Sequence, residues 1–294
     1  MFDWHRDPTC PFRRRATRVA GVALSVALCG CAPSAVATLH EQPRAAVQPS
    51  APAQLARHTG APAHAVEAVD ERAAELDGEF GVAVIDRVTG EFARGANAEL
   101  PMYSASLVKI IAAVELVERG PLTPQDRSLL QRALGPSDDE AMNALWDRHG
   151  GESLITGAVA RMHLQQTRPP DETGRWGQTT TSARDLAAVF DHLLSQVSVA
   201  DREFLLSALH AAPEEGADGV DQDFGLMAVD AHAVKSGWMC CQKGKVWLHS
   251  AGVVDPEHRR YVVALLSAQP SSAGYGGAGE ELTEAARTAL TPLR

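Results

Sequence analysis

The chain has 294 residues, a formal net charge of −10 and the composition of a globular protein, with 45% hydrophobic, 22% charged and 5% aromatic residues. That length allows one large domain or two small ones. The acidic balance argues against nucleic acid as a partner, because a phosphate backbone needs a basic surface. Five cysteines in a chain of this length are too few for a scaffold built on disulfides.

The first 31 residues have the features of an export signal. Arginines at positions 13–15 precede an apolar run at 19–28, which is too short to cross a bilayer but suits the hydrophobic region of a signal peptide. The run ends in LCGC at 28–31, which resembles a bacterial lipobox. This interpretation predicts a lipid on Cys31 and a protein anchored through acyl chains to the outer side of the cytoplasmic membrane. The alternative is an ordinary cleaved signal.

Residues 32–63 differ in composition from the sequence that follows them. They are mainly alanine, proline, glutamine, serine and threonine, with almost no aliphatic periodicity. Such a segment buries too little apolar surface to offset the conformational entropy lost on folding. We therefore expect a flexible tether there, joined to one folded domain over residues 64–294.

The first half of the folded region begins with a helix and two strands. A short helix is expected over 66–76, because apolar residues recur there at helical spacing. Residues 80–88 alternate like a strand, and a Thr-Gly turn leads into a second strand at 91–95. A further apolar helix is expected over 107–117, followed by a helical, turn-rich stretch at 123–209 with few strand signals.

The second half returns to strands. Three antiparallel strands are expected at 231–239, 245–254 and 261–268, followed by a terminal helix at 279–290. The GxGxxG pattern at 274–279 follows no predicted strand, so we interpret it as a loop and not as a nucleotide site. These elements predict an α+β fold, in which an antiparallel sheet of about five strands is flanked by N- and C-terminal helices and carries an inserted all-helical lobe. A site is expected in the cleft between sheet and lobe.

Lysine is rare in this chain, since only four of the 27 basic residues are lysines. One of them, Lys109, follows Ser106 by three residues on a predicted helix, which lets its amine reach the serine hydroxyl. A neutral lysine can take the serine proton and make the serine a nucleophile, whereas arginine cannot lose its own proton. The helix N-terminus would also stabilise negative charge that develops there. The alternative is a serine that begins a helix and a solvated lysine.

A second candidate motif is Ser137-Asp138-Asp139. Asn143 follows this motif by four residues. A structural explanation for the serine is a capping box, in which Ser137 and Glu140 satisfy backbone N–H groups at the start of a helix. The sequence around Ser137 alone favours this structural interpretation.

A third candidate motif is Lys235-Ser236-Gly237, which follows a predicted strand. A lysine and a hydroxyl on a strand that faces a cleft can bind a substrate carboxylate. Gly237 would let a substrate backbone come close to the strand. The alternative is an exposed lysine on an edge strand, which protects the edge against aggregation.

In this order, the three motifs resemble the S-x-x-K, S-D-N and K-[ST]-G signature of class A β-lactamases and penicillin-binding proteins. Residues 100–109 resemble the nucleophile segment of that family, and residues 179–187 resemble the helix that follows its Ω-loop. The resemblance implies a serine hydrolase that forms an acyl-enzyme on an amide or ester. Its substrate would be a small molecule or peptidoglycan-like compound, such as a β-lactam or a D-Ala-D-Ala-type peptide. No cofactor is implied.

The same resemblance assigns a role to each motif residue. Ser106 is implied as the acylated nucleophile, Lys109 as its base and Ser137 as the group that passes a proton to the leaving nitrogen. The backbone N–H groups of Ser106 and Trp238 are implied as the oxyanion hole. Lys235 and Ser236 are implied to bind the substrate carboxylate. The implied substrate-binding positions are Asp139, Lys235, Ser236, Gly237 and Trp238.

Three departures from the family pattern limit the implied activity. Asp139 stands where the family usually has asparagine, and an ionised carboxylate cannot donate to a substrate carbonyl. Ser137 follows Ser106 by only 31 residues, a shorter interval than in class A enzymes. The Ω-loop glutamate that activates the deacylating water is replaced in the segment at 175–178, although Asp171 and Glu172 lie nearby.

The missing glutamate argues against efficient β-lactamase turnover. A cell-wall D,D-peptidase or a small-ester hydrolase would not need it. The alternative to an enzyme is a catalytically weak or inactive lipoprotein that keeps the fold as a cell-envelope binding module.

The remaining signals predict structure and not chemistry. No metal is expected, since the eleven histidines show no ligand spacing. For the neighbours Cys240 and Cys241 we favour two packed thiols over a vicinal disulfide. Trp146, Trp176 and Trp247 are, like Trp238, candidates for lining the cleft, although most of the four are expected in the core or at its rim.

Overall fold

The structure is a computed structural model that describes residues 60–229, 233–255 and 259–294. The predicted signal, its Cys31 and nearly all of the predicted tether lie outside the described residues. Within those three ranges, no helix is long and apolar enough to cross a membrane. The same ranges contain no group of three or more histidine, cysteine, aspartate or glutamate side chains placed to bind a metal ion.

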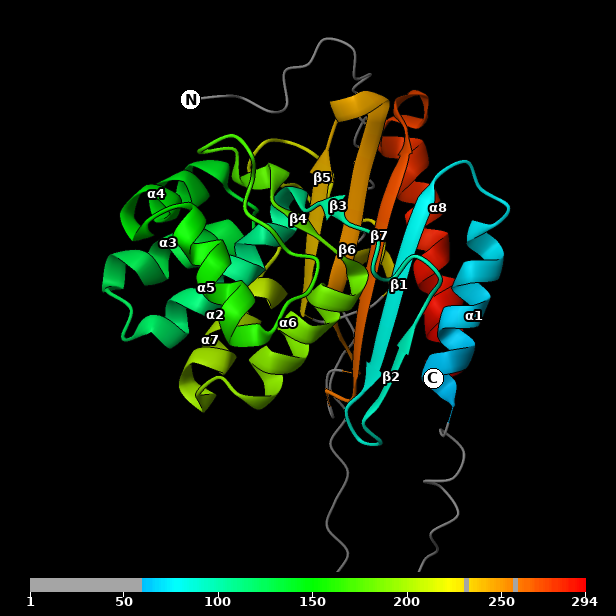
Figure 1. The fold of residues 1–294 in the computed structure, drawn as a ribbon, viewed down its shortest axis with the longest axis horizontal. Coiled ribbons are helices and arrows are strands. Elements are labelled where there is room, and N and C mark those ends of the chain that lie inside the picture. The colour runs from blue at the N-terminus through cyan, green and yellow to red at the C-terminus, as the bar shows by residue number, and fades with distance from the viewer. Residues whose placement is uncertain (1–59, 230–232, 256–258) are drawn as a thin grey trace, which may run out of the picture. The chain divides into compact units, whose positions relative to one another are not determined.

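One antiparallel sheet of five strands organises the fold, in the order β2-β1-β7-β6-β5. Figure 1 shows α1 and α8 packed on one face of this sheet and the remaining helices gathered on the other. The expected α+β class, the strand number and the flanking helices are therefore confirmed. The strands are β1 (Glu79–Asp86), β2 (Glu91–Arg94), β5 (Ala233–Met239), β6 (Lys245–Val254) and β7 (Tyr261–Pro270).

Both faces of the sheet are covered, which explains why its central strands are apolar without alternation. In β1, Val82 and Val84 pack in the core against α1 (Ala61–Ala73) and α8 (Gly274–Leu290). Ala83 and Ile85 point the opposite way, into the core formed with the other helices. Strand β5, at one edge of the sheet, is buried along its whole length.

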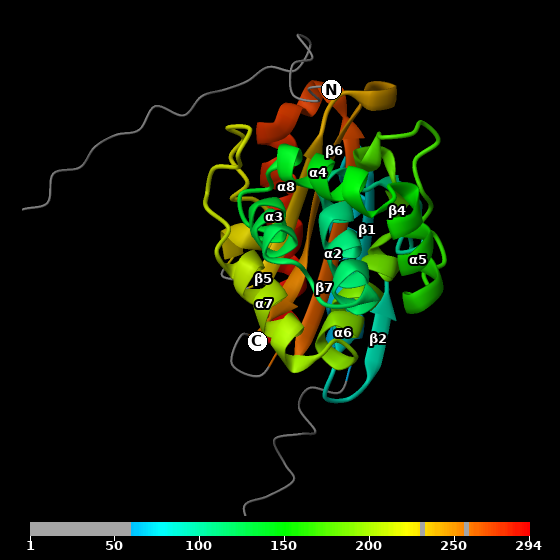
Figure 2. The ribbon, with the colours of Figure 1, turned by 90° about the vertical axis from the view of Figure 1, so that its left-hand side faces the viewer.

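The helical lobe lies between β2 and β5 in the chain and covers one face of the sheet (Figure 2). Two short antiparallel strands form a separate ribbon. Its first strand, β3 (Met102–Tyr103), lies at the start of the lobe, and its second, β4 (Thr180–Thr181), lies later in the lobe. The lobe helices are α2 (Val108–Arg119), α3 (Pro124–Leu134), α4 (Asp139–His149), α5 (Glu152–Met162), α6 (Ala183–Ser195) and α7 (Val199–His210).

Two element boundaries differ from the prediction. Helix α1 begins at Ala61, five residues before the expected start, so its first residues lie inside the predicted tether. The GxGxxG segment, expected as a loop, forms the first turns of α8. Gly274 provides the positive φ of 60° at the helix start, a conformation that glycine adopts without strain.

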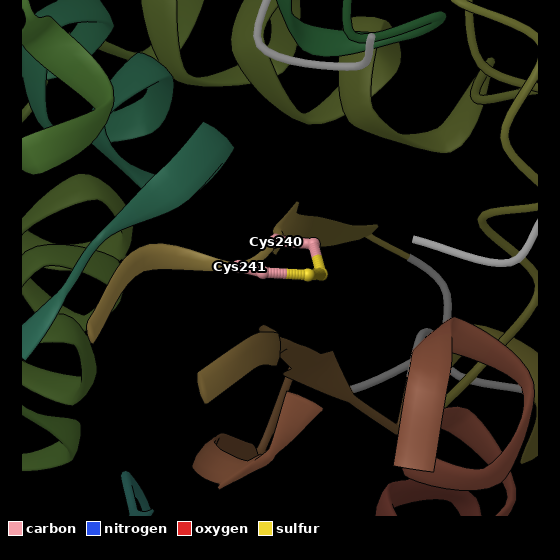
Figure 3. The surroundings of a disulfide bond; sticks show 2 residues. All are labelled: Cys240 and Cys241. Atoms are coloured by element: carbon pink, nitrogen blue, oxygen red, sulfur yellow. A yellow bond between two sulfur atoms is a disulfide. The ribbon is translucent and has the colours of Figure 1, made fainter. Parts of the chain in front are cut away.

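The interpretation of the neighbouring cysteines was wrong. Cys240 and Cys241 are joined in a disulfide (Figure 3). Strand β5 ends at Met239, so the alternation that points neighbouring strand side chains to opposite faces no longer applies to these two residues. Both sulfur atoms can therefore meet on one side of the chain.

Candidate active site

Ser106 lies on a 3₁₀ turn, Ala105–Leu107, that leads directly into α2. The residue before it, Ala105, has a φ of 46°, a conformation that residues other than glycine rarely adopt. Two hydrogen bonds fix the segment: the Ser104 N–H donates to Thr179 O over 2.7 Å, and His249 Nε2 donates to Tyr103 O over 2.7 Å. The position of Ser106 is thus set by the β3–β4 ribbon and by the sheet.

The predicted pair of Ser106 and Lys109 is in direct contact. Lys109 Nζ lies 2.9 Å from Ser106 Oγ, and the lysine side chain is fully buried. The same amine lies 2.7 Å from Asp139 Oδ1, 2.7 Å from Ser137 O and 3.1 Å from Ser137 Oγ. The lysine is therefore not the solvated residue of the alternative interpretation.

Ser137 bridges the two buried lysines. Its Oγ lies 3.1 Å from Lys109 Nζ and 3.0 Å from Lys235 Nζ, so a proton can pass between the amines through one hydroxyl. The capping alternative for Ser137 does not describe this helix, because Asp138 caps α4 by accepting from the Ala141 N–H.

Burial and the nearby Lys109 lower the pKa of Lys235 well below its usual range, against the opposing effect of Asp139 and Asp218. A lysine in this environment gives up its proton more readily than one in water. The Lys109–Ser137–Lys235 arrangement can therefore supply a neutral amine, which is the form that can act as a base.

The third motif lies on β5 and faces protein atoms. Lys235 and Ser236 are each only 1% exposed. Ser236 Oγ donates to Gln222 O over 3.3 Å, and a Cβ added to Gly237 would lie 3.2 Å from both Leu107 N and Ser104 O. Gly237 thus allows β5 to approach the nucleophile turn of this same chain.

A small depression opens beside Ser106. All four candidate tryptophans are buried in the core, and two of them, Trp176 and Trp238, also line this depression. Lys109 Nζ lies 5.0 Å from the centre of the Trp176 ring, and the indole N–H donates to Asn143 Oδ1 over 2.8 Å. The lining residues are Ala105, Ser106, Asp139, Trp176, Gly177, Trp238 and Met239.

The acidic residues near the predicted Ω-loop point elsewhere. Glu172 is largely exposed and pairs with Arg175 over 2.7 Å, and Asp171 is exposed. The ring of Trp176 instead faces the buried amine of Lys109. Sequence reasoning did not identify Asn143, Asp218 or Gln222 as contacts of site residues. Of these, only Asn143 carried a signal, because it lies four residues after Asp139 and so on the same helix face.

Comparisons with known proteins identify the family of this chain. A family model described as the Beta-lactamase enzyme family matches residues 119–291. A protein of Mycobacterium tuberculosis named "Putative lipoprotein LppW" is 36% identical over 239 residues, which are 77% of this chain and 74% of the relative. The chain belongs to the β-lactamase enzyme family. The family match includes Ser137, Asp139 and the Lys235 motif, and it begins after Ser106 and Lys109.

Solved structures of the β-lactamase family share the fold. A class A β-lactamase from Bacteroides cellulosilyticus superposes with a TM-score of 0.65 at 12% identity, covering 79% of this chain and 98% of that enzyme. A class A β-lactamase from Mycobacterium abscessus gives a TM-score of 0.60 at 17% identity, covering 78% and 99%. At such low identity, these similarities establish the fold of this family member and carry no residue roles.

Proposed function

We propose that this protein is a serine hydrolase that forms an acyl-enzyme on Ser106 from an amide or ester. The observation that carries the proposal is the 2.9 Å contact between Ser106 Oγ and the buried amine of Lys109. A serine hydroxyl beside a lysine that can lose its proton is the arrangement that nucleophilic catalysis needs. Family membership and the connection to Lys235 through Ser137 support the same function.

The proposed reaction starts with neutral Lys109. Its lone pair takes the Ser106 proton as Oγ attacks the substrate carbonyl carbon. The N–H groups of Ser106 and Trp238 stabilise the oxyanion. The bond from the carbonyl carbon to the leaving group then breaks as Ser137 gives its proton to that group, and Ser137 regains a proton from the protonated lysine. The carbonyl carbon remains bonded to Ser106 Oγ as an ester. Attack by water on this ester breaks the bond to Oγ, releases the acid and returns a proton to the Ser106 hydroxyl.

A fluorophosphonate probe tests for the activated serine, because it forms a stable ester with such a residue and releases fluoride. We expect one equivalent on the full chain, located on Ser106 by peptide mass spectrometry. Ser106→Ala should abolish labelling and leave the melting temperature nearly unchanged. Ser104→Ala is the matched control, since the hydrogen bond of the Ser104 hydroxyl within the described residues is to the carbonyl oxygen of its own neighbour, Ala105. Equal labelling of the wild type and Ser106→Ala would refute the proposal.

A binding module without turnover is the second candidate. Asp139 favours it, because its carboxylate lies 2.7 Å from Lys109 Nζ and forms an ion pair with the amine proposed as the base. Absence of any labelling at Ser106, in a chain that melts cooperatively, would support this candidate.

We further propose that the protein is anchored in the cell envelope through a lipid on Cys31, a proposal supported by the name of the mycobacterial relative.

A further inference from the structure

Removing an acyl group from Ser106 by hydrolysis requires a base and a water molecule, whereas attaching the group requires the base but no water. The base proposed for Ser106 is Lys109, whose Nζ lies 2.9 Å from Ser106 Oγ, so the serine proton can pass to it directly. In hydrolysis, a water must lie against a base while its oxygen attacks the ester carbon. The surroundings of the Lys109 amine therefore affect the second step differently from the first.

The amine of Lys109 is closed to the depression beside Ser106. Its side chain has no exposed surface, and Lys109 does not belong to the described residues that line the depression. Hydrogen bonds join Nζ to Ser106, Ser137 and Asp139. The ring of Trp176 lies over the same amine, with its centre 5.0 Å from Nζ. Because Trp176 also lines the depression, its indole forms the wall between the amine and the space that water can enter.

The indole of Trp176 is fixed in this position. Its N–H donates to Asn143 Oδ1 over 2.8 Å, and the residue is 3% exposed. Its carbonyl oxygen accepts from the Thr179 N–H over 3.0 Å, next to the 3₁₀ turn Trp176–Gln178. Side chain and backbone are both held by hydrogen bonds. The ring therefore cannot turn away from the Lys109 amine without breaking the bond to Asn143.

The acids near Ser106 are engaged with other partners or lie in solvent. Asp139 lines the depression, and its Oδ1 is paired with Lys109 Nζ over 2.7 Å. Glu172 pairs with Arg175 at an exposed position, and Asp171 is exposed. Among the residues that the structure describes, Lys109 is therefore the group best placed to take a proton from a water at the ester.

We propose that Trp176 determines how long an acyl group stays on Ser106, by keeping water away from the amine of Lys109. This inference rests on the proposed acylation of Ser106. In the step that Trp176 slows, water attacks the ester carbon and gives a proton to Lys109. The bond from carbon to Oγ then breaks, and Oγ takes a proton from the lysine, which leaves the free acid and the serine. Closing a site to water in this way protects a reactive intermediate from hydrolysis.

Burst kinetics of the full chain with p-nitrophenyl acetate separate the two steps. The first equivalent of p-nitrophenolate reports acylation, and the slower release that follows reports deacylation. We expect a burst of one equivalent per chain in the wild type. At one ester concentration, Trp176→Ala should raise the ratio of the deacylation rate to the acylation rate at least about ten-fold, a change of about 1.4 kcal/mol between the two barriers. A change in the basicity of Lys109 affects both steps, so this ratio isolates the access of water.

Three further variants complete the test, each with its melting temperature measured. Trp176→Phe keeps an aromatic ring over the amine and should have a ratio close to that of the wild type. Asn143→Ala leaves Trp176 in place, removes the acceptor of its N–H and should raise the ratio. Met239→Ala is the matched control, because it shortens another buried side chain in the wall of the same depression and should leave the ratio unchanged.

The outcomes separate the two proposals. Turnover without a burst that Ser106→Ala abolishes would mean that the acyl group leaves as fast as it arrives. The inference about Trp176 would then be wrong, and the acyl-enzyme function would stand. Wild-type ratios in folded Trp176→Ala and Asn143→Ala, or an equal rise in Met239→Ala, would also overturn the inference. If neither p-nitrophenyl acetate nor the fluorophosphonate modifies Ser106, the acyl-enzyme function itself fails.

Discussion

The amine of Lys109 is surrounded by four acceptor atoms, on Ser106, Ser137 and Asp139. An ammonium has three protons to donate, whereas a neutral amine has two and a lone pair. In the neutral form, the two N–H groups suit the closest acceptors, Asp139 Oδ1 and Ser137 O, and the lone pair is left for the Ser106 hydroxyl. Lys109 can therefore act as a base toward Ser106 only in its neutral form, so the side chain at this position must be one that can lose a proton.

Lys109→Arg tests this requirement at the residue scale. The guanidinium stays protonated, so we expect the rate of fluorophosphonate labelling of Ser106 to fall by about 10²–10⁴-fold. Lys243→Arg makes the same chemical change on an exposed side chain, which lies over the Tyr103 ring, and should label like the wild type. A Lys109→Arg protein that labels at the wild-type rate would show that another group activates Ser106.

Sequence spacing was informative for residues that meet along one helix or through a motif. It correctly brought Lys109 next to Ser106, as the structure shows, whereas the contact between Lys235 and Ser137 was not predicted. It could not show that the Trp238 ring lies 5.7 Å from Lys235 Nζ, because the position of the indole depends on Asp218 and Phe224, which belong to a loop with no recognisable pattern. The direction of a strand side chain is set by its packing partners, and these come from distant parts of the chain.

At the scale of elements, β6 is tied to the nucleophile segment by His249. The backbone N–H of Ser267 on β7 donates to His249 Nδ1, so the ring proton lies on Nε2, which donates to Tyr103 O on β3. Burial lowers the pKa of His249 to about 4. This neutral imidazole therefore joins three strands at one point.

The titration of His249 predicts a loss of stability in acid. Between pH 6.5 and 4, the unfolded chain binds a proton at His249 and the folded chain does not, so the free energy of unfolding falls as the pH falls. We expect the wild type to lose about 3 kcal/mol more than His249→Gln over this range. Urea denaturation at several pH values measures the difference. His64→Gln, on the exposed side of α1, should follow the wild type; parallel curves for His249→Gln and the wild type would contradict the prediction.

Most elements were predictable because their patterns are long. Strands of eight to ten residues such as β1 and β7, and the helix α2, were placed within a few residues of their observed ends. The ribbon of β3 and β4 was missed, since two residues are too few to show alternation. The start of α8 was missed because glycine lowers helix propensity, and three of the first four residues of this helix are glycines.

At the scale of the whole molecule, the folded part follows a predicted signal and tether that together make up about a fifth of the sequence. Two cysteines lie two positions apart at the end of the predicted apolar run. Only one of them, Cys31, follows a small residue, Gly30, as the lipobox pattern requires. Replacing each of the two cysteines separately therefore tests whether Cys31 carries the proposed lipid anchor.

Cys31→Ala should move the full-length protein from the membrane fraction to the soluble fraction of a bacterial host that processes lipoproteins. The reason is that a cysteine thiol is needed to carry the lipid, and acyl chains supply the membrane affinity. Cys29→Ala should remain with the membranes and incorporate an alkyne-labelled fatty acid, detected by click chemistry. Equal fractionation of both variants would be evidence against lipidation at Cys31.

Two of the four tryptophans in the described part of the chain, Trp176 and Trp238, lie in the wall beside Ser106. Each indole N–H donates to a side chain, and each ring faces a lysine amine. Indole emission is sensitive to nearby charge and to displaced water. Acylation of Ser106 should therefore change the intrinsic fluorescence of the protein. A stopped-flow trace of that emission could follow the acylation of Ser106 in real time without any dye.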